Sequence, residues 1–217
     1  EIYQLSKKLV TFLVQKKVKL IVLACNTITV SCLDLLRKDF PGIPIIGTVP
    51  VVKTASEKTK NRRIGILSTK QTAKSIYQKN LIKKFTNNLK VLNLGTDNLV
   101  PIVESGEIKG ARINKVLKET LKPFSDFNVD VLALGCSHFS FLRKQIGQIL
   151  GKNVLILDSA GAIARQVKRV LENNKDLSVY NSLGHILLTT GDLKKFNILS
   201  NKILGKRFKN ASIKRMS

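Results

Sequence analysis

Residues 19–36 read KLIVLACNTITVSCLDLL: an apolar run that reaches Cys25, then a polar pair, then apolar residues at helical spacing. Residues 130–146 read DVLALGCSHFSFLRKQI and repeat this order around Cys136. A short apolar run that passes into helical spacing is typical of a buried strand leading into a helix. The sequence therefore predicts two separate strand–helix units, each with a thiol where its strand ends.

The same alternation of apolar runs and helical patterns continues through most of the chain. The apolar runs lack strict polar alternation, which is typical of parallel strands covered on both faces. They predict strands at 20–24, 43–47, 63–67, 90–94, 130–135, 153–158 and 185–190. The segments between them predict helices at 4–16, 28–38, 50–58, 72–86, 110–122, 139–150 and 160–173. This alternation indicates an α/β fold with mostly parallel sheets. We expect the chain to cross between two domains in the Pro-containing segment 41–50 and to return near 158–162.

Composition fits a globular protein with an unusually basic surface. The 217 residues are 43% apolar, and 38 Lys+Arg against 14 Asp+Glu give a net charge of +24. A polyanion such as nucleic acid could use this charge. The basic residues are nevertheless spread along the chain, and aromatic residues make up only 6% of it. We therefore interpret the charge as a solvated, Lys-rich surface and expect no nucleic-acid partner.

Cysteine usage and hydropathy predict a cytoplasmic protein. Three Cys do not make a disulfide framework in a chain of this length, and an odd count fits a reducing compartment. With only two His at these spacings, we expect no zinc site. No apolar run approaches the ~18 residues of a membrane helix. The opening EIYQLSKKLV lacks the long apolar segment of a signal peptide.

Cys25 and Cys136 are the candidate reactive groups. Sites in parallel α/β folds gather at the carboxyl ends of strands, and the free N–H groups of a following helix favour a thiolate. We therefore expect both sulfurs to be better bases than an average Cys. One Cys in this setting is more often a small buried packing residue, but two in matching settings favour function. Cys32 lies seven residues after Cys25 on the predicted helix and is expected to pack in the core.

Two kinds of chemistry fit these thiols. Cys136 and His138, two residues apart, could form a nucleophilic Cys–His pair of the kind that hydrolases and amidotransferases use. Alternatively, the two thiols could work as acid and base on opposite faces of one carbon. That chemistry needs two similar proton carriers on opposite walls of a cleft. The repeated strand-end pattern favours this second reading.

The same segments resemble the glutamate racemases of the cofactor-independent aspartate/glutamate racemase superfamily. The resemblance rests on LACNT, LGCSHF, IPIIGTVPVVKTA, RIGILSTKQTAKSIYQKNLI, VPIVESGEI and LILDSAGAIA, at 23–27, 134–139, 43–55, 63–82, 100–108 and 155–164, and it extends from about residue 5 to about residue 205. It implies two similar domains, a discontinuous first one of 1–47 plus 160–217 and a second of 48–159, with the active site in the cleft between them.

The resemblance also assigns roles to individual residues. It implies that Cys25 and Cys136 are the two acid/base groups, one for each enantiomer, that His138 tunes Cys136 and that Glu104 orients His138. It implies substrate contacts from Asn26, Thr27, Thr69, Thr72, Ser137 and His138. Ser137 replaces the Thr usual after the second Cys and keeps its hydroxyl. Helix capping is a compatible second role for the Thr pair, because STKQTAKS (68–75) also reads as a helix start.

The chain departs from the family pattern at its front. The family's opening Asp-Ser-Gly-x-Gly-Gly loop and later Pro-Tyr-Gly segment have no counterpart, and the only Met is Met216. We expect from this that an amino-terminal portion is missing and that the first domain is incomplete. We also expect the 217-residue chain alone to be poorly soluble or partly disordered in its first domain, and to show no measurable racemase activity.

The resemblance implies interconversion of L- and D-glutamate without pyridoxal phosphate, metal or any other cofactor, and D-glutamate that feeds peptidoglycan synthesis. Other functions stay open from the sequence: an aspartate racemase of the same superfamily, an inactive racemase fragment, or a basic nucleic-acid-binding protein. We expect glutamate as the small-molecule partner, allow for a homodimer, and expect no membrane association.

Overall fold

The computed structural model describes residues 1–178, 184–205 and 211–216. Its strands are β1 (Ile21–Leu23), β2 (Ile45–Gly47), β3 (Arg63–Ser68), β4 (Lys90–Gly95), β5 (Val131–Gly135), β6 (Leu155–Leu157), β7 (Ile186–Thr189) and β8 (Ser212–Arg215). Its helices are α1 (Ile2–Gln15), α2 (Asn26–Asp39), α3 (Val52–Lys58), α4 (Lys70–Lys74), α5 (Ile76–Phe85), α6 (Leu99–Glu104), α7 (Ala111–Asp126), the 3₁₀ helix η1 (Ser137–Leu142), α8 (Arg143–Leu150), α9 (Ala160–Asn173) and α10 (Leu193–Leu204).

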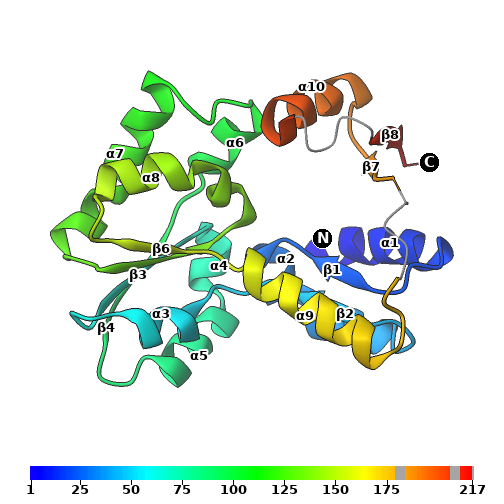
Figure 1. The fold of residues 1–217 in the computed structure, drawn as a ribbon, viewed down its shortest axis with the longest axis horizontal. Helices are drawn as coiled ribbons and strands as arrows, with labels where there is room; N and C mark the ends of the chain where they lie inside the picture. Colours follow the sequence, from blue (N-terminus) through cyan, green and yellow to red (C-terminus); the bar gives the residue numbers. More distant parts are fainter. Residues whose placement is uncertain (179–183, 206–210, 217) are drawn as a thin grey trace.

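The largest sheet has the strand order β4-β3-β5-β6, and each neighbouring pair runs parallel. Figure 1 shows α6, α7 and α8 on one face of this sheet and α3, α4 and α5 on the other. Because both faces are covered, the apolar side chains of β3 and β5 are buried in two core layers. Phe124 and Leu132 belong to one layer, and Ile64, Ile66 and Ala133 belong to the other.

Two smaller parallel sheets, β1–β2 and β7–β8, complete the fold. Helices α1 and α2 pack together over β1 around Val10, Leu33 and Leu36, and α9 contacts β2. Every strand pair in the described part of the chain is parallel, so the predicted α/β class is confirmed. The predicted domain boundaries stay a prediction. Helix α10, which that prediction gave to the first domain, lies beside α6 of the larger sheet (Figure 1).

The crossing segment after β2 runs past the carboxyl end of the larger sheet. A Cβ added at Gly135 would lie 3.0 Å from Pro50 Cγ and 2.9 Å from the side chain of Ser68. Glycine therefore lets Pro50 approach the last residue of β5 closely. This contact brings the segment that leaves the β1–β2 sheet directly beside Cys136.

Several elements differ from those predicted. The single helix expected at 72–86 is two helices, because Ser75 is extended and caps α5 by accepting from the Gln78 N–H at 3.1 Å. The helix expected at 139–150 begins as the 3₁₀ helix η1. Ser159 occupies the N-cap position of α9 but makes no capping hydrogen bond; the Asp158 carboxylate accepts from the Ala160 N–H instead.

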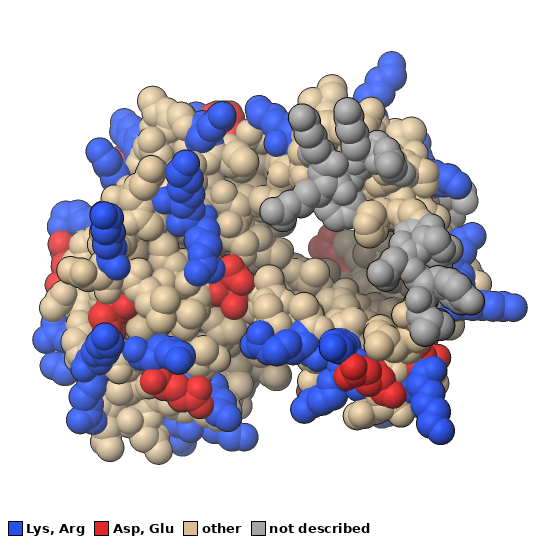
Figure 2. Space-filling view, in the orientation of Figure 1, with Lys and Arg blue, Asp and Glu red and all other residues tan. Residues whose placement is uncertain are grey.

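Figure 2 shows Lys and Arg side chains dispersed over the visible face outside the grey residues, with the fewer Asp and Glu side chains scattered between them. On this face the cations do not form one continuous stripe, which fits the solvated surface expected from the sequence. No helix among the described residues is long and apolar enough to cross a membrane.

The amino ends of β3 and β5 are joined by the Asp130 carboxylate. It accepts from the Thr59 hydroxyl at 2.5 Å and from the backbone N–H groups of Lys60 at 2.5 Å and Asn61 at 2.9 Å. Burial alone would raise the pKa of Asp130, but the hydrogen bonds from Thr59, Asn61 and Lys60 outweigh it and hold the pKa below its ordinary value. A carboxylate bound this way should stabilise the fold.

We expect Asp130→Asn to lower the free energy of unfolding by about 1–3 kcal/mol at pH 7, because a charged acceptor of three hydrogen bonds is lost. The folded-state pKa is depressed, so this stabilisation is present above the unfolded pKa of about 3.9 and disappears as pH falls through the lower folded value. Urea titrations at pH 7 and at about pH 3 measure both effects. Asp126→Asn, which loses only an exposed pair with Lys122, is the control. Equal midpoints for wild type and Asp130→Asn at pH 7 would contradict this account.

Candidate active site

Cys25 and Cys136 occupy equivalent places in two different sheets. Cys25 follows β1 and is the N-cap residue of α2, and Cys136 follows β5 and is the N-cap residue of η1. Thr27, two residues after Cys25, lies 2.9 Å from Thr69, and the residue before Thr69, Ser68, pairs with Gly135 next to Cys136. The two sheets thus bring their strand-end thiols toward a common region.

The environment of Cys136 corrects one expectation. Burial raises the pKa of the Cys136 thiol to about 11, against smaller lowering by the backbone N–H groups of His138 and Phe139. The helix start was expected to make this sulfur more acidic. Its thiol instead lies in an apolar layer, only 8% exposed, where loss of water disfavours the thiolate more than two N–H groups favour it. At neutral pH Cys136 is therefore a thiol.

A chain of contacts leads from Cys136 to solvent. Cys136 Sγ lies 3.9 Å from His138 Nδ1, and His138 Nε2 lies 2.8 Å from Glu104 Oε1. A carboxylate can only accept, so Nε2 carries the proton in this bond, and in a neutral ring Nδ1 is then an acceptor facing the thiol. This arrangement can take a proton from the Cys136 thiol and return it.

Three threonine hydroxyls bridge the two parts of the site. Thr27 Oγ1 lies 2.9 Å from Thr69 Oγ1 and 3.1 Å from Thr72 Oγ1, and Thr69 and Thr72 are 3.0 Å apart. Thr69 also caps α4 by accepting from the Thr72 N–H. Thr27 comes from the first turn of α2, just after Cys25. Thr72 is fully buried, so it would reach a substrate only through the other two hydroxyls.

The remaining sequence candidates have distinct surroundings. Asn26 is 2% exposed, and its Nδ2 donor has no hydrogen-bond partner among the described residues. Ser137 is exposed at the start of η1. Cys32 is 3% exposed in the core of α1, α2 and β1, and its Sγ donates to the Ile28 carbonyl at 3.2 Å, which confirms the predicted packing role. No group of three or more His, Cys, Asp and Glu residues within the described ranges could hold a metal ion.

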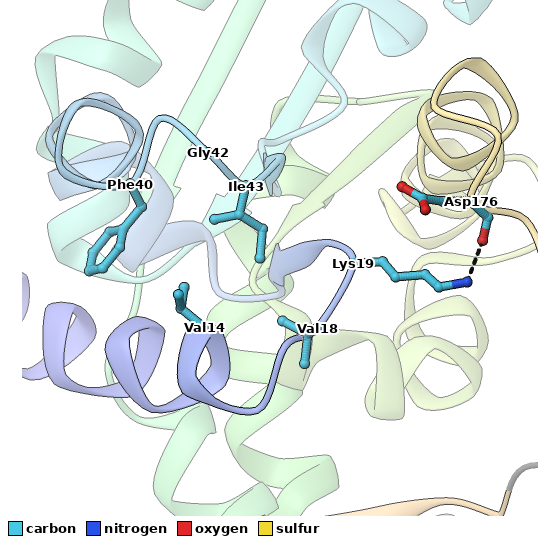
Figure 3. Close-up of a pocket in the computed structure, with 7 residues that line it drawn as sticks. All are labelled: Val14, Val18, Lys19, Phe40, Gly42, Ile43 and Asp176. Carbon is cyan, nitrogen blue, oxygen red and sulfur yellow. Dashed lines mark hydrogen bonds between the residues drawn. The ribbon is translucent and has the colours of Figure 1, made fainter.

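Figure 3 shows a cavity of about 440 Å³ that lies away from the two thiols, at the amino end of the β1–β2 sheet. It is lined by Val14, Val18, Lys19, Phe40, Gly42, Ile43 and Asp176. The ammonium group of Lys19 donates to the backbone carbonyl of Asp176 at 2.7 Å. Parallel strands place all their amino ends together, so this cavity lies at the opposite end of the sheet from Cys25, and no thiol lines it.

Comparison with known proteins places this arrangement in a family. The Asp/Glu/Hydantoin racemase family matches residues 3–167, the range that holds both thiols and all the side chains described around them. The chain belongs to the Asp/Glu/Hydantoin racemase family. One relative in this family, the glutamate racemase of Clostridium perfringens strain SM101, is 36% identical over 205 residues, which cover 94% of this chain and 76% of the relative.

Solved structures of Asp/Glu racemases share the fold. The Escherichia coli glutamate racemase, in complex with L-glutamate and the activator UDP-MurNAc-ala, matches with a TM-score of 0.84 at 27% identity, covering 100% of this chain and 81% of that one. The Francisella tularensis glutamate racemase, in complex with D-glutamate, matches with a TM-score of 0.83 at 26% identity, covering 100% and 80%.

Sequence reasoning missed one wall of this site. Helix α10 places Phe196 and Leu199 beside Glu104 and His138. The sequence does contain a signal for helix α10. Asp192 is an N-cap whose carboxylate accepts from the Lys195 N–H at 2.7 Å, and apolar residues then recur at helical spacing.

Proposed function

We propose that this racemase interconverts L- and D-glutamate, with Cys25 and Cys136 as the two acid/base groups. The observation that carries the proposal is the pairing of two strand-end thiols from different sheets, each at the start of a helix, with Thr27 beside one of them and Thr69 from the other part only 2.9 Å apart. Inversion at a carbon requires proton removal on one face and proton delivery on the other, and two such thiols match that need. Relatives named glutamate racemase, with L- or D-glutamate bound, support glutamate as the substrate.

In one direction the Cα–H bond of glutamate breaks as the Cys25 thiolate takes the proton. Cys136, a thiol at neutral pH because burial raises its pKa to about 11, gives its proton to the opposite face of the planar carbanion. In the other direction Cys136 must first lose its proton, and His138 Nδ1 at 3.9 Å is placed to accept it. Glu104 holds the ring in the tautomer that makes this possible. Each turnover moves one proton onto one sulfur and one proton off the other.

We propose that the polar groups beside Cys25 bind the ends of the substrate. The unpartnered Nδ2 donor of Asn26 and the hydroxyls of Thr27 and Thr69 can donate to carboxylate oxygens. With no ligand bound, the hydroxyls satisfy one another; with a ligand they can rotate toward it. Ser137, exposed at the start of η1, offers a further hydroxyl.

Thr27→Val is expected to raise the KM for glutamate roughly tenfold, with a smaller change in kcat, because one charge-assisted hydrogen bond of about 1.5–3 kcal/mol is lost at nearly constant shape. Steady-state kinetics in both directions measure this. Thr86→Val is a matched control, since it removes a buried hydroxyl that donates to the Ile82 carbonyl at 2.7 Å outside the site. An equal rise in KM for both variants would contradict the substrate role.

The proposal carries three further points. We propose that the protein works in the cytoplasm, that its D-glutamate supplies peptidoglycan synthesis, and that the catalytic cleft lies between domains of 1–47 plus 160–217 and of 48–159. A homodimer stays a prediction.

The test is formation of D-glutamate from L-glutamate by the purified full-length gene product, in EDTA and without added pyridoxal phosphate. Chiral chromatography gives the ratio of enantiomers, which should approach one from either side. L-Aspartate under the same conditions is the comparison. Faster racemisation of aspartate, or no racemisation of either amino acid, would overturn the assignment.

A further inference from the structure

A small cavity of about 170 Å³ lies between α10 and the residues that support Cys136. Two of its walls are Glu104, the last residue of α6, and His138 of η1. The other walls are Val103, Phe141, Phe196, Leu199, Ser200, Ile203 and Leu204. The carboxylate–imidazole pair therefore sits at the border between an apolar wall supplied by α10 and solvent.

The Glu104–His138 pair is too exposed to fix its own geometry. The side chains are 58% and 32% exposed. Exposed ion pairs contribute roughly 0–1 kcal/mol, while holding a long Glu side chain in one rotamer costs about 1.5–2 kcal/mol of conformational entropy. Something else must restrict Glu104 if its carboxylate is to stay 2.8 Å from His138 Nε2.

Helix α10 is fixed to this region by two independent contacts. Phe196, Leu199 and Ile203 recur at helical spacing and turn one apolar face toward α6 and η1, and Ile203 packs against the larger core. Lys202 lies over Gly106, where an added Cβ would come within 2.7 Å of Lys202 Cδ. Gly106 has a φ of +77° and closes the turn just after Glu104.

We propose that Phe196 of α10 is a positioning residue that holds the Glu104 carboxylate against His138. The aromatic side chain occupies the apolar side of the cavity, so Glu104 keeps the rotamers that reach His138 and loses those that turn away. The effect on catalysis rests on the proposed racemase function, because His138 acts there through Cys136. The effect on the hydrogen bond itself does not depend on that function.

The first test is proton NMR of the imidazole of His138. The chain has two His, so a His185→Gln background leaves one imidazole to observe. An Nε2–H proton bonded to Glu104 should give a downfield resonance that exchanges with solvent more slowly than a free imidazole N–H, and Glu104→Ala, which removes the acceptor, marks its loss. We expect Phe196→Ala to lose the resonance, Phe196→Leu to retain most of it, and Ile198→Ala to leave it unchanged. Ile198 is 69% exposed on the same helix and does not line the cavity.

The second test is elimination of chloride from the two enantiomers of a single diastereomer of 3-chloroglutamate. One base removes the α-proton, the C–Cl bond breaks, and the resulting enamine hydrolyses to 2-oxoglutarate and ammonium, so each enantiomer reports one thiol. We expect Phe196→Ala to slow the Cys136-dependent elimination about tenfold and to leave the other enantiomer's rate unchanged. General loss of structure would lower both rates.

The inference is overturned if Phe196→Ala keeps the protected resonance, if Ile198→Ala loses it equally, or if wild type lacks it. If wild type shows the protected resonance of His138 but neither eliminates chloride nor racemises glutamate, the proposed function is refuted and the positioning role of Phe196 is not.

Discussion

Cys136→Ser is expected to abolish racemisation of glutamate, with a fall of about 10⁴-fold, the upper end of what general acid–base catalysis contributes. A Ser hydroxyl is nearly the same size as a thiol but is far too weak an acid and base at neutral pH. Cys25→Ser should give the same loss. Both thiols are needed in each direction, one to remove a proton and one to supply it, so neither variant keeps half of the activity.

The two variants should separate in a reaction that needs only one base. With 3-chloroglutamate, Cys136→Ser is expected to lose elimination from one enantiomer and keep it from the other, and Cys25→Ser is expected to show the reverse preference. Formation of 2-oxoglutarate, followed by a coupled NADH-dependent assay, measures both. This crossed result is specific to thiols that face opposite sides of one carbon.

Cys32→Ala is the control for both variants. Cys32 lies on α2, is 3% exposed and packs in the core, so removing its sulfur should cost some stability and leave most of the activity. Loss of elimination from both enantiomers in Cys136→Ser would point instead to one Cys–His nucleophile and would refute the two-thiol mechanism.

The parts of the fold that the sequence predicts well are those in which one apolar run makes one buried element. β3 and β5 were predicted at 63–67 and 130–135 and lie at Arg63–Ser68 and Val131–Gly135. Both are central strands covered on two faces, so almost every residue in them must be apolar or small. Burial on both sides leaves a signal that does not depend on knowing the neighbours.

Elements that depend on tertiary contacts were missed. Strand β8 (Ser212–Arg215) carries charged side chains and is held by pairing with β7, so its local pattern does not predict a strand. Helix α6 (Leu99–Glu104) has only six residues and contains Pro101. A short segment with a proline has little helical propensity of its own, and packing of Ile102 and Val103 into the core stabilises it.

The candidate site also has some features that local sequence pattern predicts and others that depend on tertiary contacts. The strand-end places of Cys25 and Cys136 follow from local pattern alone. The pairing of His138 with Glu104, 34 residues earlier, was expected only from family resemblance, and in the structure the two side chains lie 2.8 Å apart. The depth of Cys136 could not be predicted, because its burial depends on how α6, α7 and η1 close over β5. That burial reverses the expected direction of the pKa shift.

His138→Asn is expected to slow the Cys136-dependent elimination roughly 10²-fold at pH 7.5, within the range for loss of a general base. Burial raises the pKa of Cys136 to about 11, so only about 10⁻⁴ of this sulfur is thiolate at pH 7 and about 10⁻² at pH 9. Without His138 to accept the proton, catalysis must wait for this minor form. The elimination rate of the variant should therefore rise about tenfold per pH unit from pH 7 to 9.

The sign of this dependence separates a proton acceptor from a packing residue. The active form of the base is the deprotonated one, and a raised pKa moves its appearance to higher pH, so the defect of His138→Asn should shrink as pH rises. Damage to packing would leave a defect that does not change with pH. His185→Asn, at the residue before β7, is the control and should keep the wild-type profile. A constant deficit across pH 7–9 would mean that His138 does not take the proton of Cys136, and the catalytic role assigned to the Glu104–His138 pair would fail with it.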